Sequence, residues 1–292
     1  MTAISAPLRR PGHWIRMPVT LRRILHHRAG RFCFVFLTLL VLVAIFAPMV
    51  APQDPYAQDL VSAMQGPSSK HWLGTDYLGR DVLSRLVYAT RIAVNAPIVA
   101  VGLAVVLGLP SGLYAGYRRG RVADLMGRVA DALLSIPPIV AAIAIVAAVG
   151  SGLTTTMLAI GLVFAPRLFR IVRGATLNVA EEGYVDAAES IGSSTARVVW
   201  VHCLPNVLAP LLVQISLMMG FALLAEASLS FLGLGVQLPQ ASWGSMLKTA
   251  AESQFQAPFA VLPTGLCLTV TILVLNTFGD VIRDVTADRK EA

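Results

Sequence analysis

Six apolar runs, each long enough to cross a lipid bilayer, are the feature that most constrains how this chain can fold. A transmembrane helix needs about 20 apolar residues, and the runs cover residues 32–50, 93–117, 132–150, 153–172, 207–232 and 259–281. The fourth run is the weakest, because three threonines open it and Arg167 arrives early. We count it as a span, since the tight Gly150-Ser151-Gly152 turn must send the chain straight back. The sequence therefore predicts an all-α polytopic membrane protein with six transmembrane helices.

The composition excludes a soluble protein. Hydrophobic residues make up 56% of the chain and charged residues 13%, whereas roughly 25% charge is usual for soluble domains. The first run, Phe32–Val50, exceeds the apolar region of about 7–15 residues of a signal peptide and continues into Ala47-Pro48, so we interpret it as an uncleaved anchor. The net charge of +7 does not indicate nucleic-acid binding, because no basic face is interleaved with aromatic residues.

The distribution of basic residues predicts the orientation of the spans. Cytoplasmic loops carry an excess of Lys and Arg. Eighteen of the 23 Lys and Arg residues fall before the first span, between spans two and three, between spans four and five, or after the sixth. The other loops hold only Lys70, Arg80, Arg85, Arg91 and Lys248. We therefore expect both termini and the loop between spans four and five to be cytoplasmic.

That loop contains a polar segment whose residue order predicts a docking site. A short helix rich in small residues comes first, and Gly192 suits the left-handed C′ position that ends such a helix. A second helical stretch and a proline that opens the next span follow. The residues that we expect to take part in docking are Tyr184, Val185, Asp186, Ala187, Ala188, Gly192, His202, Leu204, Pro205 and Asn206.

The loop after the first span also carries an ordered pattern. Val82–Arg91 has the pattern of an interfacial helix, and Asp81 is its natural N-cap. The loop either caps and anchors the protein or forms a lid or docking surface for an external solute-binding protein. The residues of interest are Gly74, Thr75, Asp76, Gly79, Arg80 and Asp81.

Three features within the spans are candidates for functional roles. Glu226 lies deep in an apolar run, where an ionisable group is by default a functional candidate; it makes a structural hydrogen bond, serves a cavity or gate, or couples protons. Gly108, Gly112 and Gly116 place the smallest side chain on one helix face, which suits close helix packing or a hinge near Pro110. Pro137-Pro138 should kink or end a helix, and a bend there could widen a central cavity.

No catalytic or metal-binding motif stands out in the sequence. It contains no GxxxxGK[ST] phosphate loop, no HExxH pair and no Gly-x-Ser-x-Gly elbow. The five histidines and three cysteines are dispersed. We expect no catalytic residue, no metal site and no cofactor in this chain, so energy for uphill transport must come from a partner or an ion.

Several segments resemble one family. Residues 184–206 resemble the "EAA" coupling segment of binding-protein-dependent ABC importer permeases, with Asp186 where the family usually has Glu. Residues 73–85 resemble the "LGTDxxGRDxxSR" signature of the dipeptide, oligopeptide and nickel permeases (DppC/OppC-like). Further matches are Ser230–Gly235, Trp243-Gly244, Gly279-Asp280 and Arg283-Asp284.

The resemblance implies a type I ABC importer permease (MetI-like) fold in the bacterial inner membrane. It also implies a second permease subunit, two ATPase subunits that bind ATP and Mg, and an extracytoplasmic solute-binding protein. The substrate stays open among dipeptides, longer peptides, nickel and related solutes. An ion-coupled secondary transporter that uses Glu226 is the alternative, although we see neither a repeat nor a second intramembrane acid.

The expected organisation follows the spans. We expect a basic cytoplasmic arm at 1–31, the first span at 32–50, and an extracytoplasmic loop with an interfacial helix at 51–92. A five-helix permease core at 93–282 contains the cytoplasmic coupling loop 173–206, and a cytoplasmic tail covers 283–292.

Overall fold

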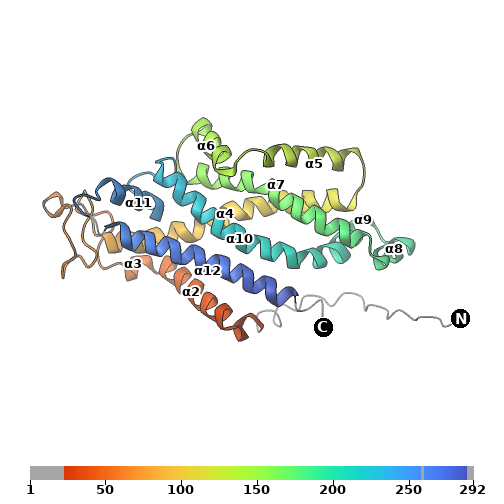
Figure 1. Cartoon of the computed structure of the whole chain (residues 1–292), viewed down its shortest axis with the longest axis horizontal. Coiled ribbons are helices and arrows are strands. Elements are labelled where there is room, and N and C mark those ends of the chain that lie inside the picture. Colours follow the sequence, from red (N-terminus) through yellow and green to blue (C-terminus); the bar gives the residue numbers. More distant parts are fainter. Residues whose placement is uncertain (1–22, 258–259, 288–292) are drawn as a thin grey trace.

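The computed structural model describes residues 23–257 and 260–287, so parts of the predicted arm and tail lie outside the described residues. Long helices run roughly along one axis (Figure 1). Apart from one isolated bridge between Thr75 and Asp81, the regular structure of the described residues is helical. The elements are α2 (Arg28–Ile45), α3 (Ala47–Val50), η1 (Leu60–Ser62), α4 (Val82–Tyr117), α5 (Arg121–Leu134), α6 (Pro138–Val149), α7 (Leu153–Ala180), α8 (Gly183–Ser190), α9 (Thr195–Arg197), the π-helix η2 (Val198–Cys203), α10 (Leu204–Phe231), α11 (Trp243–Glu252) and α12 (Val261–Ala287).

Five helices are long and apolar enough to cross a membrane, and a sixth span results if α5 and α6 count as one. These two helices meet at 89°, so the single straight span expected at 132–150 is replaced by a bent pair of helices that begins earlier, at Arg121. The break lies at Pro137-Pro138: Pro137 is the N-cap of α6 and Pro138 its first residue. A proline has no N–H to continue the preceding helix, whereas the first position of a new helix needs none.

Helix α4 replaces two predicted elements. The expected interfacial helix at 82–91 and the span at 93–117 form one continuous helix of 36 residues. The side chain of Asp81 accepts a hydrogen bond from the backbone N–H of Ser84, which is the N-cap interaction expected from the sequence. Helix α7 likewise continues past the expected end of its span at 172, to Ala180.

The glycines of α4 lie against α7. A Cβ atom placed at Gly112 would lie 2.7 Å from the Cβ of Val172, and one at Gly116 would lie 2.5 Å from the Cβ of Thr176. Gly108 faces Ala165 and Leu168 in the same way. The two helix backbones can approach this closely only because these positions carry no side chain.

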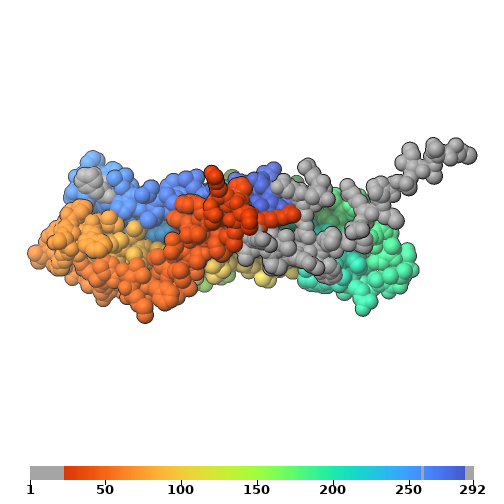
Figure 2. Space-filling model, turned by 90° about the horizontal axis from the view of Figure 1, so that it is seen from below, coloured from red at the N-terminus to blue at the C-terminus, as the bar shows by residue number. Residues whose placement is uncertain are grey.

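Outside this packed centre, the helices expose large apolar side chains. Phe32, Val35, Leu39 and Leu42 form an exposed stripe on α2, and α5 exposes a similar stripe. Such surfaces suit a lipid environment or a partner helix, since lipid tails are as apolar as these side chains. Two different segments form the ends of the elongated molecule: loop 51–81 (orange) lies at one end, and the segment after α7 (green) lies at the other (Figure 2).

Candidate functional site

The segment between α7 and α10, residues 181–203, forms a compact cap at one end of the bundle. Helix α8 turns two of its residues inward, Val185 and Ala188, which are 1% and 7% exposed and join the central hydrophobic core. Asp186 and Ala187 are exposed. Of the two alanines that we expected to take part in docking, only Ala187 is therefore on the outer face, because the helical period places Ala188 against the protein's own core.

Helix α8 ends at Ser190 and is followed by a hydrogen-bonded turn at Gly192. Gly192 has a φ of +81°, a left-handed conformation. Its N–H donates to the carbonyl of Glu189 at 2.9 Å, and the N–H of Ser193 donates to the carbonyl of Ala188 at 3.1 Å. This pair of bonds is the Schellman motif, which satisfies the last carbonyls of the helix. The geometry agrees with the role of Gly192 that its place in the sequence suggested.

Side chains from both ends of the segment meet at the start of α10. The amide of Asn206 donates to the Tyr184 hydroxyl at 3.0 Å and to the carbonyl of His202 at 2.8 Å. The rings of Tyr184 and His202 are 6.2 Å apart between centroids. Burial, with a smaller contribution from Glu182, raises the pKa of Tyr184 above its usual value. Leu204 and Pro205 are the first residues of α10, where a proline is tolerated.

Contacts that the sequence analysis missed tie this segment to the end of α4. The hydroxyl of Tyr117 donates to the carboxylate of Glu189, and the guanidinium of Arg119 lies 2.5 Å from the carboxylate of Glu181. The acids stand more than 60 residues away from their partners. The signal available in the sequence was charge: one acid precedes α8 and another lies in its last turn, while the turn after α4 is basic.

The outer face of the segment exposes both apolar and charged side chains. Ile191 is 84% exposed and Trp200 is 56% exposed, and Asp186 and Ala187 of α8 are exposed as well. Exposed apolar side chains together with a helix of small residues suit the groove of a partner protein.

Loop 51–81, at the opposite end, is held together by buried ion pairs. Asp76 accepts hydrogen bonds from the backbone N–H groups of Leu78 and Arg80, and its carboxylate binds the Arg80 guanidinium at 2.7 Å. Asp81 binds His71 at 3.0 Å as well as capping α4. These residues organise the loop from within.

Two glycines and a threonine of the same signature fit where larger residues would not. Gly74 and Gly79 have φ values of +77° and +73°. A Cβ atom at Gly79 would lie 1.7 Å from the carbonyl oxygen of Asp59. The hydroxyl of Thr75 donates to the carbonyl of Ser62 and accepts from the N–H of Gln65. The signature therefore has a structural explanation in its own loop.

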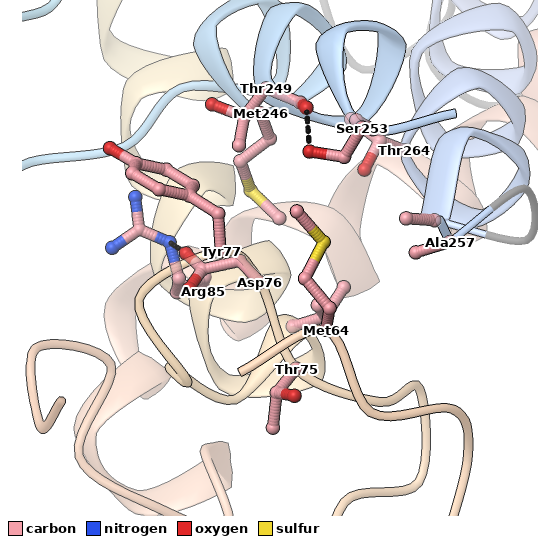
Figure 3. Close-up of a pocket in the computed structure, with 13 residues that line it drawn as sticks. Met64, Thr75, Asp76, Tyr77, Arg85, Met246, Thr249, Ser253, Ala257 and Thr264 are labelled. Carbon is pink, nitrogen blue, oxygen red and sulfur yellow. Dashed lines mark hydrogen bonds and ion pairs between the residues drawn. The ribbon is translucent and has the colours of Figure 1, made fainter. Parts of the chain in front are cut away.

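A small cavity separates this loop from α11 and the start of α12 (Figure 3). Its volume is about 30 Å³, room for about one water molecule. Met64 and Met246 project into it, and the ion pair between Arg85 and Asp76 lies at its edge. The cavity is too small to be a solute site in this conformation.

Glu226 is 1% exposed and makes a local hydrogen-bond network. The hydroxyl of Ser230 donates to its carboxyl at 2.7 Å and accepts a bond from the N–H of Val236 at 3.1 Å. Glu226 does not line the cavity beside loop 51–81. The geometry favours the structural hydrogen bond over the gate and proton-coupling interpretations, because the network fixes the turn that follows α10.

Within the described ranges, no three His, Cys, Asp or Glu residues are grouped so that they could hold a metal ion. The three cysteines are free, and Cys33 and Cys203 are buried.

Comparison with known proteins gives consistent matches. Residues 108–291 match the family model of the binding-protein-dependent transport system inner membrane component, and residues 19–67 match the N-terminal TM domain of oligopeptide transport permease C. A putative peptide transport system permease protein of Brucella abortus is 38% identical over 93% of this chain and 91% of its own length. The dipeptide transport system permease protein DppC of Alkalihalophilus pseudofirmus is 38% identical over 86% of this chain and 82% of its own.

A glutathione transport system permease protein, GsiD of Pectobacterium atrosepticum, is 36% identical over 90% of this chain and 88% of its own length. Among solved structures, a chain of the MetNI methionine ABC transporter in an inward-facing conformation superposes with a TM-score of 0.56. It is 19% identical, and the match covers 70% of this chain and 96% of that one. At this identity the likeness supports the fold.

Proposed function

The chain belongs to the family of binding-protein-dependent transport system inner membrane components, the permeases of ABC importers, and from this premise we propose that it forms half of a translocation pathway for peptides or a related small solute. The observation that carries the proposal is the match to peptide, dipeptide and glutathione permeases over 86–93% of the chain. The ion-coupled alternative finds no support, since Glu226 is engaged in a closed hydrogen-bond network.

The segment around α8 is our proposed contact for the cytoplasmic ATPase subunits, which would bind ATP and Mg. Its support is the outer face formed by Asp186, Ala187 and Ile191 on a helix that is capped and anchored to α4. Closure of the ATPase pair would pull this helix. Because α8 is fixed to the ends of α4 and α10, the pull would reach the spans as a rigid displacement rather than be lost in a loop.

The remaining partners follow from the family. We propose a second permease chain for the other half of the pathway, two ATPase subunits, and an external solute-binding protein that selects the solute. The exposed apolar residues Val122, Leu125, Val129 and Leu133 along one side of α5 suit contact with the second permease or with lipid. The excess of basic residues supports cytoplasmic termini in a bacterial inner membrane.

The test is a substitution on the outer face of α8. Ala187→Arg places a long charged side chain where a partner would approach, and Ala187→Ser is the matched control at the same position. In the tagged complex, we expect both variants to insert in the membrane, while Ala187→Arg loses the ATPase subunits and solute uptake. If Ala187→Arg keeps both, α8 is not the ATPase contact. If the unmodified chain carries no ATPase through purification and drives no ATP-dependent uptake, the importer proposal itself fails.

A further inference from the structure

A second cavity, of about 200 Å³, opens at the same end of the molecule as loop 51–81. It lies between this loop, the first turns of α4, the start of α7 and the turn that follows α10. We call it the Arg85–Arg91 cavity; Tyr56, Arg85, Tyr88, Arg91 and Gln240 are among the residues that line it. Cavities for drug-sized ligands measure about 300–1,000 Å³, so this one suits a group about the size of one amino-acid residue.

The cavity has an uncompensated positive charge. Two guanidinium groups line it and no carboxylate does. Asp76 is the nearby acid, at 3.5 Å from the Nε of Arg85 (Figure 3), but the same carboxylate is already bound by Arg80 at 2.7 Å. Arg80 and Arg85 therefore share one negative charge. Arg91 adds a third positive charge and forms no ion pair with any of the described residues.

Arg85 is a preorganised group rather than a flexible surface side chain. Its side chain is 6% exposed, and its NH1 donates to the carbonyl of Pro55 at 3.2 Å. Apart from the Nε–Asp76 ion pair, this is the one bond that the Arg85 guanidinium makes within residues 23–257 and 260–287, although a guanidinium carries five donors in a fixed fork. A fork of this kind matches the two oxygens of a carboxylate.

The helix and an aromatic pair give the cavity its shape. Arg85, Tyr88 and Arg91 are spaced three residues apart on α4, which puts them along one side of the helix. The ring of Tyr56 packs edge-on against Tyr88 at 6.1 Å between centroids, which attaches loop 51–81 to this wall. The turn at the rim is held to α7 by the bond from the N–H of Gly152 to the carbonyl of Leu234.

We propose that the Arg85–Arg91 cavity binds the carboxylate of a small organic anion, such as the C-terminal carboxylate of a short peptide. Arg85 would be the buried anchor and Arg91 the exposed charge that attracts the anion, with the tyrosine rings covering its apolar part. The identity of the anion as transported solute rests on the proposed function; the presence of a carboxylate site does not. A lipid phosphate is the competing source of negative charge.

Charged thiol-specific reagents can probe the electrostatic potential in the cavity directly. In the full complex, with Cys33, Cys203 and Cys267 replaced by alanine, Gln240→Cys places a thiol at the rim. Leu238→Cys is the control, because Leu238 is 63% exposed in the same turn and does not line the cavity. The measured quantity is the ratio of two rates of cysteine modification: the rate with an anionic methanethiosulfonate (sulfonatoethyl) divided by the rate with a cationic one (trimethylammonioethyl).

We expect this ratio to be at least about tenfold higher at position 240 than at 238, since clefts of one sign raise local counter-ion concentration by that order. Adding Arg91→Gln should bring the ratio down toward the control, and Arg91→Lys should keep it high. Millimolar dialanine should slow modification at 240 in phosphatidylcholine nanodiscs, whereas dialanine amide, which lacks the carboxylate, should not.

Three results would overturn the proposal. They are equal ratios at 240 and 238, equal protection by dialanine and its amide, or protection that comes from phosphatidylglycerol in the nanodisc and not from dialanine. The last would identify a lipid-phosphate site. ATP-dependent uptake by the unmodified complex is measured in parallel. If the complex takes up solute but position 240 shows no preference for the anionic reagent, only the carboxylate site is rejected. If position 240 shows that preference but the complex takes up no solute, only the importer proposal is rejected.

Discussion

At the scale of single residues, the local structure at each end of the molecule depends on one residue: Asp76 through its side chain and Gly192 through its backbone conformation. Asp76 binds two backbone N–H groups and a guanidinium, and it lies near a second guanidinium. Gly192 ends α8 in a conformation that most residues avoid. Both positions can be tested by substitutions that change little else.

Asp76→Asn should destabilise loop 51–81 strongly. The change leaves the buried guanidinium groups of Arg80 and Arg85 without a nearby carboxylate, and removing one partner of a buried ion pair costs about 3–5 kcal/mol. Asp59→Asn is the control: it is the same chemical change in the same loop, but Asp59 is exposed, and a hydrogen bond from Ser62 lowers its pKa. Thermal unfolding of the purified protein should show a large loss for the first variant and a small one for the second. Equal losses would contradict the buried network.

Gly192→Val should destabilise the end of α8 by about 1 kcal/mol or more, because a β-branched residue is strained at a φ of +81°. No atom lies within 4 Å of a Cβ placed there, so the cost is conformational and not steric. Gly192→Asn is the matched control, since asparagine tolerates the left-handed region. Limited proteolysis between residues 181 and 203 should rise for valine and much less for asparagine. Similar rates for both variants would show that the turn relaxes freely.

At the scale of elements, the α4–α7 pair forms the centre of the fold, and the bent α5–α6 pair lies outside it (Figure 1). The pair is tight because three glycines of α4 face α7. Helices α5 and α6 contact α7 over shorter stretches and meet at 89°. The packed pair should therefore be sensitive to added volume at particular positions only.

Gly112→Ala should lower stability, whereas Gly102→Ala should not. A Cβ atom at Gly112 would lie 2.7 Å from the Val172 Cβ and 2.9 Å from a backbone carbonyl of α7, and overpacking of this kind costs about 1–3 kcal/mol. Gly102 is in the same helix with nothing within 4 Å, so alanine there should be neutral or stabilise by up to about 1 kcal/mol. The melting temperature in detergent should fall for Gly112→Ala and stay level or rise for Gly102→Ala. A lower value for Gly102→Ala alone would contradict the packing.

At the scale of the whole molecule, α4 links the two ends that carry the proposed functions. Its 36 residues span about 54 Å at 1.5 Å per residue. Arg85 and Arg91 line a cavity near its start, while Tyr117 at its end donates to Glu189 in the last turn of α8. A displacement of α8 would thus reach the opposite end through one helix packed on α7.

The orientation of the molecule can be measured on both ends at once. In the cysteine-free background, Val61→Cys and Ile191→Cys report on opposite ends, and both positions are highly exposed, at 91% and 84%. We expect a membrane-impermeant thiol reagent added to intact cells to label position 61 and not 191, because the basic loops should be cytoplasmic. Labelling of 191 alone would invert the topology, and equal labelling of both would reject it.

The sequence by itself determined what depends on composition or on near neighbours along the chain. The apolar runs define the spans, Asp81 caps the helix that follows it, and Gly192 and Pro137-Pro138 end or break helices. Each is a local effect: about 20 apolar residues cross a bilayer, and a cap or a proline acts within one helical turn. The family signatures belong to this class, since they are contiguous in the chain.

Only the tertiary structure decided which faces are free and which distant residues meet. It turned Ala188 inward and Ala187 outward, set α5 and α6 at 89°, and paired Glu189 with Tyr117 across 72 positions. It also placed loop 51–81, α4 and the turn after α10 around the Arg85–Arg91 cavity. The physical reason is that burial and ion pairing depend on contacts between helices, and the pattern along one helix does not determine which neighbour covers it.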